Sequence, residues 1–180
     1  GPSELMIMAD EAADAPLIAA DLLSQAEHDA DAQVILAASS METLDAVAKA
    51  LEAQLASLPR ADIARASLEQ ARLIQTRDLA EAADIANAYA PEHLALHVEA
   101  PDALLDRIDN AGAIFVGRWS AETFGDYICG PSHVLPTDGA ARAWSGVSVA
   151  SFMKSFTVQT LDEAGARALA GAAARPARLE

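Results

Sequence analysis

Short apolar runs alternate with helical stretches over the first two thirds of the chain, and this alternation limits the possible folds most strongly. The stretches between the runs space their apolar residues as helices do, and Ser40 and the pair Asp78 and Glu81 stand at capping positions. Strands that alternate with helices predict an α/β fold, here a Rossmann-like, mainly parallel sheet flanked by helices. The expected strands are Leu5–Met8, Val34–Leu36, Leu73–Thr76, Leu94–Val98 and Ala113–Val116.

From about residue 117 the chain becomes rich in Gly and Pro. Long irregular segments in compact domains are usually functional or disordered, and the aromatic residues within this one argue against disorder. Farther on, residues 155–160 predict a strand and residues 162–174 an Ala-rich helix. We therefore expect two parts. Residues 1–147 form the α/β domain with the chemically active side chains, and residues 148–180 form a small strand–helix extension.

Composition excludes several classes of function. The chain has 180 residues, a formal net charge of −15 and 52% hydrophobic residues. The charge argues against nonspecific binding to nucleic acids and to anionic membranes, because both need clustered cations. No apolar run is long enough to span a bilayer. The single cysteine, Cys129, excludes an internal disulfide and predicts a cytoplasmic protein.

One candidate site lies at the end of the first predicted helix. Gln25 and His28 are three residues apart and project from one face, so an amide oxygen and an imidazole could hold a divalent cation. The simpler interpretation is a histidine that interacts favourably with the helix C-terminus. Spacing alone leaves both open.

The other candidates follow later in the chain. Glu92 and His93 form an adjacent acid and imidazole that could share proton transfer, although a solvated loop pair would look the same. Asp126 lies beside Gly125, where a carboxylate can approach a ligand closely or simply occupy a turn. His97 alternates with leucines, as a strand residue without a chemical role would, and Cys129 is most simply a buried, inert thiol. The sequence contains no Gly-x-Gly-x-x-Gly, P-loop or Cys-x-x-Cys motif.

Taken together, several segments resemble the histidinol dehydrogenase family. The order and intervals of the segments are also similar to those of the family, and the run Asp-Leu-Leu-Ser-Gln-Ala-Glu-His is the most specific. The segments are residues 1–4, 20–28, 90–94, 111–117, 125–127 and 130–137.

The resemblance implies an enzyme that oxidises L-histidinol to L-histidine in two NAD-dependent steps through an aldehyde. Gln25, His28 and Asp126 match three protein ligands of the family's Zn²⁺, which anchors the substrate. Glu92 and His93 match the catalytic pair, and the residues that hold Zn²⁺, together with His93, also count as substrate-binding. The two further positions that match substrate contacts are Ser3 and Glu180, and the family's Glu comes from the partner subunit of a homodimer.

Length is the point where the chain departs from the family, whose members are more than twice as long. We therefore expect a C-terminal portion of the enzyme, lacking the opening strands of a split domain, the NAD contacts and a fourth metal ligand beyond Glu180. Two other interpretations stay open. One is a non-catalytic metal- or ligand-binding module derived from the family. The other is a related dehydrogenase of amino alcohols or sulfonates.

Overall fold

The structure is a computed structural model that describes residues 3–178. The chain divides into two units, the first ending at Ser148 and the second beginning at Val149. The first unit contains β1 (Glu4–Ala9), α1 (Ala15–Ala26), β2 (Gln33–Ala38), α2 (Met41–Leu55), α3 (Ala61–Leu68), β3 (Arg72–Gln75), α4 (Leu79–Tyr89), β4 (His93–His97), α5 (Asp102–Leu105), β5 (Ala113–Val116), α6 (Glu122–Tyr127) and the 3₁₀ turn η1 (Ala140–Arg142). The second contains η2 (Val149–Phe152), α7 (Glu163–Ala173) and η3 (Pro176–Arg178).

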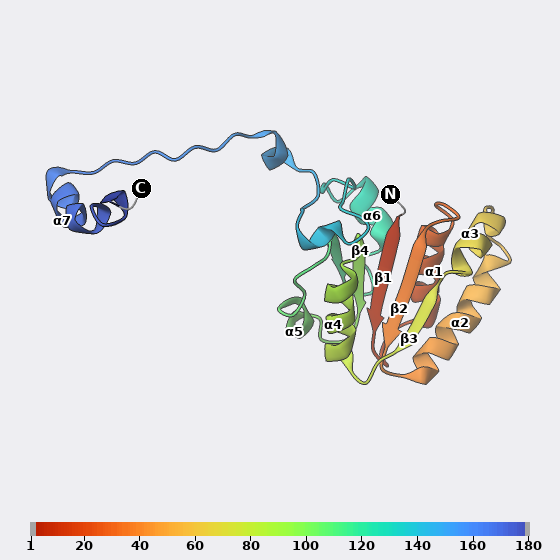
Figure 1. Cartoon of the computed structure of the whole chain (residues 1–180). Coiled ribbons are helices and arrows are strands. Elements are labelled where there is room, and N and C mark those ends of the chain that lie inside the picture. Colours follow the sequence, from red (N-terminus) through yellow and green to blue (C-terminus); the bar gives the residue numbers. More distant parts are fainter. Residues whose placement is uncertain (1–2, 179–180) are drawn as a thin grey trace. The chain divides into compact units, whose positions relative to one another are not determined.

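The strands form one five-stranded sheet in the order β3-β2-β1-β4-β5 (Figure 1). Every pair of neighbouring strands is parallel. This confirms the predicted α/β fold, and all five expected strands of the first unit are present within a residue or two. In the register between β1 and β4, Leu5 lies opposite His93, so Glu4 lies beside Glu92.

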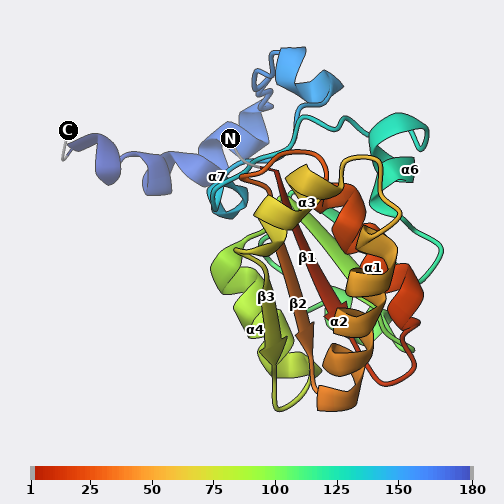
Figure 2. The same cartoon turned by 90° about the vertical axis from the view of Figure 1, so that its right-hand side faces the viewer.

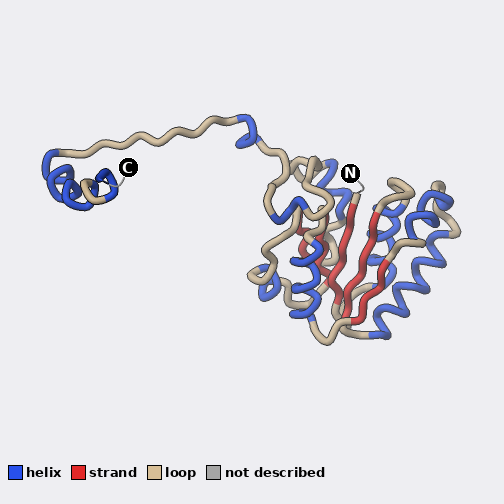
Figure 3. Tube along the Cα trace, viewed as in Figure 1, coloured by secondary structure: helices blue, strands red, loops and turns tan. Residues whose placement is uncertain are grey.

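Helices cover both faces of the sheet. In Figure 2 the helices α1 and α2 lie on one side of the strands and α4 lies on the other, and Figure 3 shows the strands between these helical layers. Strand β1 is buried along its whole length, with Leu5 and Ile7 packed into the core under α1 and α2 and Met6 and Met8 packed into the core under α4. A strand buried on both faces explains why its sequence is a continuous apolar run.

The helix starts follow the predicted caps. The Ser40 hydroxyl accepts a hydrogen bond from the amide of Thr43 at 3.3 Å, and the Asp78 carboxylate accepts one from the amide of Glu81 at 2.8 Å. Helix α4 ends at Ala90, whose φ of 57° and ψ of 63° are left-handed. This turn stops the helix and directs the next residues into β4.

The second unit corrects one expectation. Helix α7 is present as predicted, but residues 155–160 form no strand. Phe156 and Val158 are 79% and 78% exposed, and no strand among residues 3–178 pairs with this segment. An alternating sequence becomes a strand only where a neighbour satisfies its N–H and C=O groups. Among residues 3–178 as a whole, no helix is long and apolar enough to cross a membrane.

Candidate active site at the N-terminal edge of the sheet

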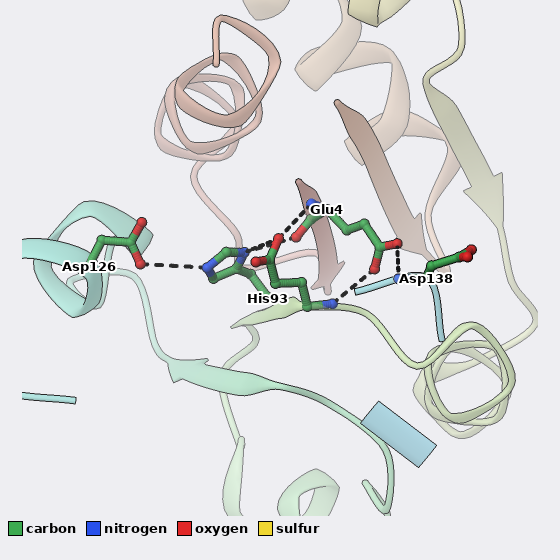
Figure 4. Close-up of polar contacts among 5 residues, drawn as sticks. Glu4, His93, Asp126 and Asp138 are labelled. Atoms are coloured by element: carbon green, nitrogen blue, oxygen red, sulfur yellow. Dashed lines mark hydrogen bonds and ion pairs between the residues drawn. The ribbon is translucent and has the colours of Figure 1, made fainter. Parts of the chain in front are cut away.

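The two central strands begin with polar residues that meet at one edge of the sheet. Glu4 is the first residue of β1, His93 is the first residue of β4, and Glu92 directly precedes it. All three are buried. Because neighbouring parallel strands begin at the same edge, the fold brings together side chains that are almost 90 residues apart in the sequence (Figure 4).

Hydrogen bonds join these three residues into one cluster. The main-chain amide of Glu4 donates to Oε2 of Glu92 at 3.0 Å. The main-chain amide of Glu92 in turn donates to Oε2 of Glu4 at 3.1 Å. Nδ1 of His93 lies 3.0 Å from the carbonyl oxygen of Glu4 and 3.5 Å from Oε2 of Glu92. Both neighbours accept hydrogen bonds, so Nδ1 carries the proton and Nε2 is left as the basic nitrogen.

Helix α6 supplies two more carboxylates. Residues 125–127, expected in a loop, belong to this short helix, and Oδ1 of Asp126 lies 3.6 Å from Nε2 of His93. Glu122 stands one helical turn earlier and is buried. Ligand atoms of His93, Glu122 and Asp126 all lie within 4.8 Å of one another. The spacing i, i+4 places Glu122 and Asp126 on the same face of α6.

The site shifts the acidity of two carboxyl groups. Burial raises the pKa of Glu122 to about 7, with the nearby carboxylates of Asp126, Asp21 and Glu92 adding to the effect and His93 opposing it. Burial also raises the pKa of Glu92, against hydrogen bonding to Glu4 and the attraction of His93. Clustered buried groups with raised pKa values are typical of sites that move protons.

The metal ligands expected from the resemblance are only partly gathered. Gln25 lies in the last turn of α1 and is 1% exposed, and its Oε1 has no hydrogen-bond partner among the residues that the structure describes. His28 is exposed beyond the end of α1 and is not a member of the His93, Glu122 and Asp126 group. Ser3 is half-buried and directly precedes β1, and its carbonyl accepts a hydrogen bond from the amide of Gln33 at 2.9 Å. Glu180 lies outside the described residues.

The geometry fits a divalent cation near His93 and Asp126. Two ligand atoms of a tetrahedral Zn²⁺, each about 2.1 Å from the ion, lie roughly 3.4 Å apart, close to the 3.6 Å between His93 Nε2 and Asp126 Oδ1. An ion held by this pair would occupy the free nitrogen of His93, and it is an alternative to the ligand set of Gln25, His28 and Asp126. Buried polar atoms without hydrogen-bond partners include Gln25 Oε1, His93 Nε2 and Glu122 Oε2. Unsatisfied buried oxygen and nitrogen atoms are costly, and Zn²⁺ accepts such ligands.

Two glycines permit the close packing around the cluster. A Cβ on Gly112 would lie 2.6 Å from the carbonyl oxygen of Glu92, and a Cβ on Gly125 would lie 2.4 Å from the ring of Phe115. That ring packs on His93 with centroids 5.8 Å apart. Neither position therefore has room for a side chain beside Glu92 and Phe115.

Two other expectations have different outcomes. His97 lies at the far end of β4, where its Nε2 is 3.0 Å from Oδ2 of Asp21, and its Nδ1 is buried without a hydrogen-bond partner among the described residues. This agrees with its interpretation as a strand residue. Cys129, expected to be buried, is exposed, because it follows α6 in a segment that packs little against the core.

Comparison with known proteins identifies the family. The family model described as histidinol dehydrogenase matches residues 1–180. The chain belongs to the histidinol dehydrogenase family. It is 53% identical over 180 residues to a histidinol dehydrogenase of Xanthomonas oryzae pv. oryzae, covering 100% of this chain and 42% of the relative. It is 52% identical over 170 residues to one of Yersinia pestis, covering 94% of this chain and 38% of the relative.

A solved histidinol dehydrogenase has the same fold. The crystal structure from Elizabethkingia anophelis matches with a TM-score of 0.94 and 42% identity, over 99% of this chain and 41% of that chain. The chain thus spans about two fifths of the length of these members of the family. The recognised motifs therefore lie in a fold that the family shares.

Glu4 and Glu122 were not among the site residues predicted from the sequence. Glu122 could have been found from its i, i+4 spacing to Asp126, had the Gly-containing segment been interpreted as a helix. Glu4 stands out only as a charged residue at the start of a wholly apolar strand. Such a residue needs buried partners, and its partners come from the sheet register.

Proposed function

We propose that this chain forms the substrate-oxidising part of a histidinol dehydrogenase, in which L-histidinol becomes L-histidine through the aldehyde. The observation that carries the proposal is the state of His93. Its Nδ1 is held by the carbonyl of Glu4, and its Nε2 is buried beside Asp126 without a hydrogen-bond partner in the described part of the chain. An imidazole fixed in this way is prepared to accept a proton at Nε2.

His93 acts in the first oxidation. Its Nε2 accepts the proton of the substrate hydroxyl as the carbon loses a hydride. The Nδ1–H bond to the Glu4 carbonyl and the nearby Glu92 carboxylate stabilise the resulting imidazolium. NAD supplies the hydride acceptor, and no residue of this chain is assigned to it.

Glu92 acts in the second oxidation. Its carboxylate takes a proton from the water that adds to the aldehyde, which gives the hydrate that loses the second hydride. Burial raises its pKa, so it is a stronger base than an ordinary glutamate. The bond from the Glu4 amide holds one carboxylate oxygen, Oε2, and thereby fixes the orientation of the group.

Gln25, His28 and Asp126 are the proposed Zn²⁺ ligands, and with Ser3, His93 and Glu180 they form the proposed substrate-binding set. When bound, Zn²⁺ supplies a Lewis acid that anchors the imidazole and amine of the substrate. Because His28 is exposed in the structure, its side chain must turn toward Gln25 to join the set. A homodimer, in which Glu180 serves the neighbouring subunit, is part of the same proposal.

The activity is tested in a chimera in which this chain replaces the matching 180 residues of the Xanthomonas oryzae relative. We expect NADH formation that depends on L-histidinol, and two NADH for each histidine produced. A folded chimera that binds Zn²⁺ and forms no NADH would favour the non-catalytic module. Faster turnover of another amino alcohol would favour the related dehydrogenases.

The metal ligands are tested by titrating Zn²⁺ into the chain by calorimetry. We expect Q25A, H28N and D126N each to weaken binding. If E122Q weakens it and H28N does not, the ion instead uses the group of His93, Glu122 and Asp126.

A further inference from the structure

Glu4 uses every polar group it has at the candidate site. It is 2% exposed although it carries a carboxyl group. Its amide donates to the Glu92 side chain, and its carbonyl faces Nδ1 of His93. Its carboxylate accepts from the amide of Glu92 through Oε2 and from the amide of Asp138 through Oε1, the latter at 2.8 Å. Figure 4 shows these contacts converging on one residue.

The contact with Asp138 connects the catalytic pair to a distant loop. Asp138 has a φ of 56° and is followed by Gly139 with a φ of 72°, so the chain turns sharply there. Four residues after Asp138, Arg142 donates to the carbonyl of Ala88 near the end of α4. The loop is therefore fastened at two points, one on the Glu4 carboxylate and one on the helix that leads to Glu92.

The span of the Glu4 side chain matters as much as its charge. Its two oxygens reach two separate amides at 3.1 Å and 2.8 Å, on β4 and on the loop. An aspartate at this position would be shorter by one methylene, about 1.5 Å, and would leave both amides beyond hydrogen-bond distance of its oxygens. A glutamine would keep one acceptor oxygen and place an NH₂ donor against the other amide.

We propose that Glu4 is the positioning residue of the catalytic pair: its main chain orients His93 and Glu92, and its carboxylate fixes the Glu92 peptide to the loop at Asp138. As a role in catalysis, this rests on the proposed function. The hydrogen-bonded arrangement itself does not, so it can be tested without activity. In the enzyme, Glu4 does not touch the reacting atoms and acts through Glu92 and His93.

The first test measures the tautomer of His93 by ¹⁵N NMR of the histidine-labelled chain, with His93 assigned from the H93N variant. We expect one neutral form, protonated at Nδ1 and unprotonated at Nε2. A spectrum in which Nε2 carries the proton, or in which both tautomers exchange, overturns the orientation by the Glu4 carbonyl.

The second test measures amide hydrogen exchange at Glu92 and Asp138 in three variants. We expect E4D to expose both amides, with exchange about tenfold faster, E4Q to expose one of them, and E52Q on the outer face of α2 to change neither. If E4D protects both amides better than E4Q does, charge and not span is the important property, and the proposal fails.

In the chimera, the same variants separate positioning from substrate binding. We expect kcat to fall in the order wild type, E4Q, E4D, with KM changing much less. A change confined to KM, or equal activity in all three variants with altered amide exchange, would overturn the catalytic part of the proposal and leave the hydrogen-bond assignment in place.

Discussion

Strand β4 carries a buried histidine at each end, and the two have opposite surroundings. His97 pairs through Nε2 with Asp21 of α1, at 3.0 Å. His93 has its Nδ1 fixed by the main chain, and its Nε2 lies beside carboxylates of α6 without a hydrogen-bond partner among residues 3–178. The Nδ1 of His97 is also buried without a hydrogen-bond partner among the described residues, but His97 belongs to no group of clustered ligand atoms there. His93 is oriented and left with a free basic nitrogen.

This difference explains why a buried histidine alone does not indicate chemistry. Both side chains are almost completely buried, at 3% and 4% exposure. What distinguishes them is which nitrogen the protein satisfies and whether several titratable groups face the other one. At His93, the carboxyl groups of Glu122 and Asp126 lie near Nε2, and the carboxyl group of Glu92 lies near Nδ1.

Replacing His93 should give the largest functional effect. We expect H93N in the chimera to lower kcat by about 10² to 10⁴-fold, because it removes the proposed general base. The midpoint of thermal unfolding, measured by circular dichroism, should change little. If H97N lowers kcat as much as H93N while the protein stays folded, the contrast between the two ends of β4 is wrong.

Adding a methyl group at Gly112 should disturb the same end of the strand without touching a titratable group. The new Cβ would meet the Glu92 carbonyl oxygen at 2.6 Å and Pro136 at 3.2 Å, so Glu92 and His93 must move. We expect G112A to lower kcat on the order of 10²-fold, the size of effect that misplacement by about 1 Å can produce. Gly171 in α7 has open space around it, so G171A is the matched control. Activity in G112A equal to that in G171A would show that the pair tolerates displacement.

Removing the charge at Glu122 should change how stability depends on pH. Burial raises the pKa of this group to about 7 from an ordinary value near 4.5. Between these values the folded chain binds more protons than the unfolded one, so stability falls as pH rises. In metal-free chain, E122Q should remove this penalty and raise the free energy of unfolding relative to wild type at pH 8 by about 3 kcal/mol. At pH 4.5 the gain should be far smaller.

Urea unfolding at the two pH values, followed by circular dichroism, checks the prediction for Glu122. Fluorescence is a poor probe because Trp119 and Trp144 are 76% and 73% exposed. The exposed Glu52 offers a matched control, E52Q. If the free energy of unfolding changes with pH by the same amount in wild type and E122Q, Glu122 ionises as an exposed glutamate does.

The sequence predicted the strands and helices of the first unit better than the residues of the candidate site. The strand Leu5–Met8 and the helix start at Asp78 depend on local patterns, and both are present. Residues 155–160 also had a local pattern, but a strand depends on a partner that these residues lack. Glu92, His93 and Asp126 were identified through the family resemblance. The roles of Glu4 and Glu122 depend on sheet register and on the placement of α6, which no local pattern specifies.

The smallest effect is expected at the other end of β4, from H97N. The substitution removes a hydrogen bond to a carboxylate and leaves Asp21 facing the protein, with its side chain only 15% exposed. We expect the free energy of unfolding to fall by about 2 kcal/mol, while kcat of the chimera stays within twofold of wild type when assayed well below the unfolding midpoint. Because Asp21 also raises the pKa of Glu122, the double variant D21N/H97N should recover part of the lost stability at pH 8. The D21N substitution removes the unpaired charge of Asp21 and, with it, the repulsion between Asp21 and Glu122. If the double variant recovers no stability, the whole loss in H97N comes from the packing of the His97 ring. His97 and Asp21 would then connect α1 to the sheet through their shape and not through charge.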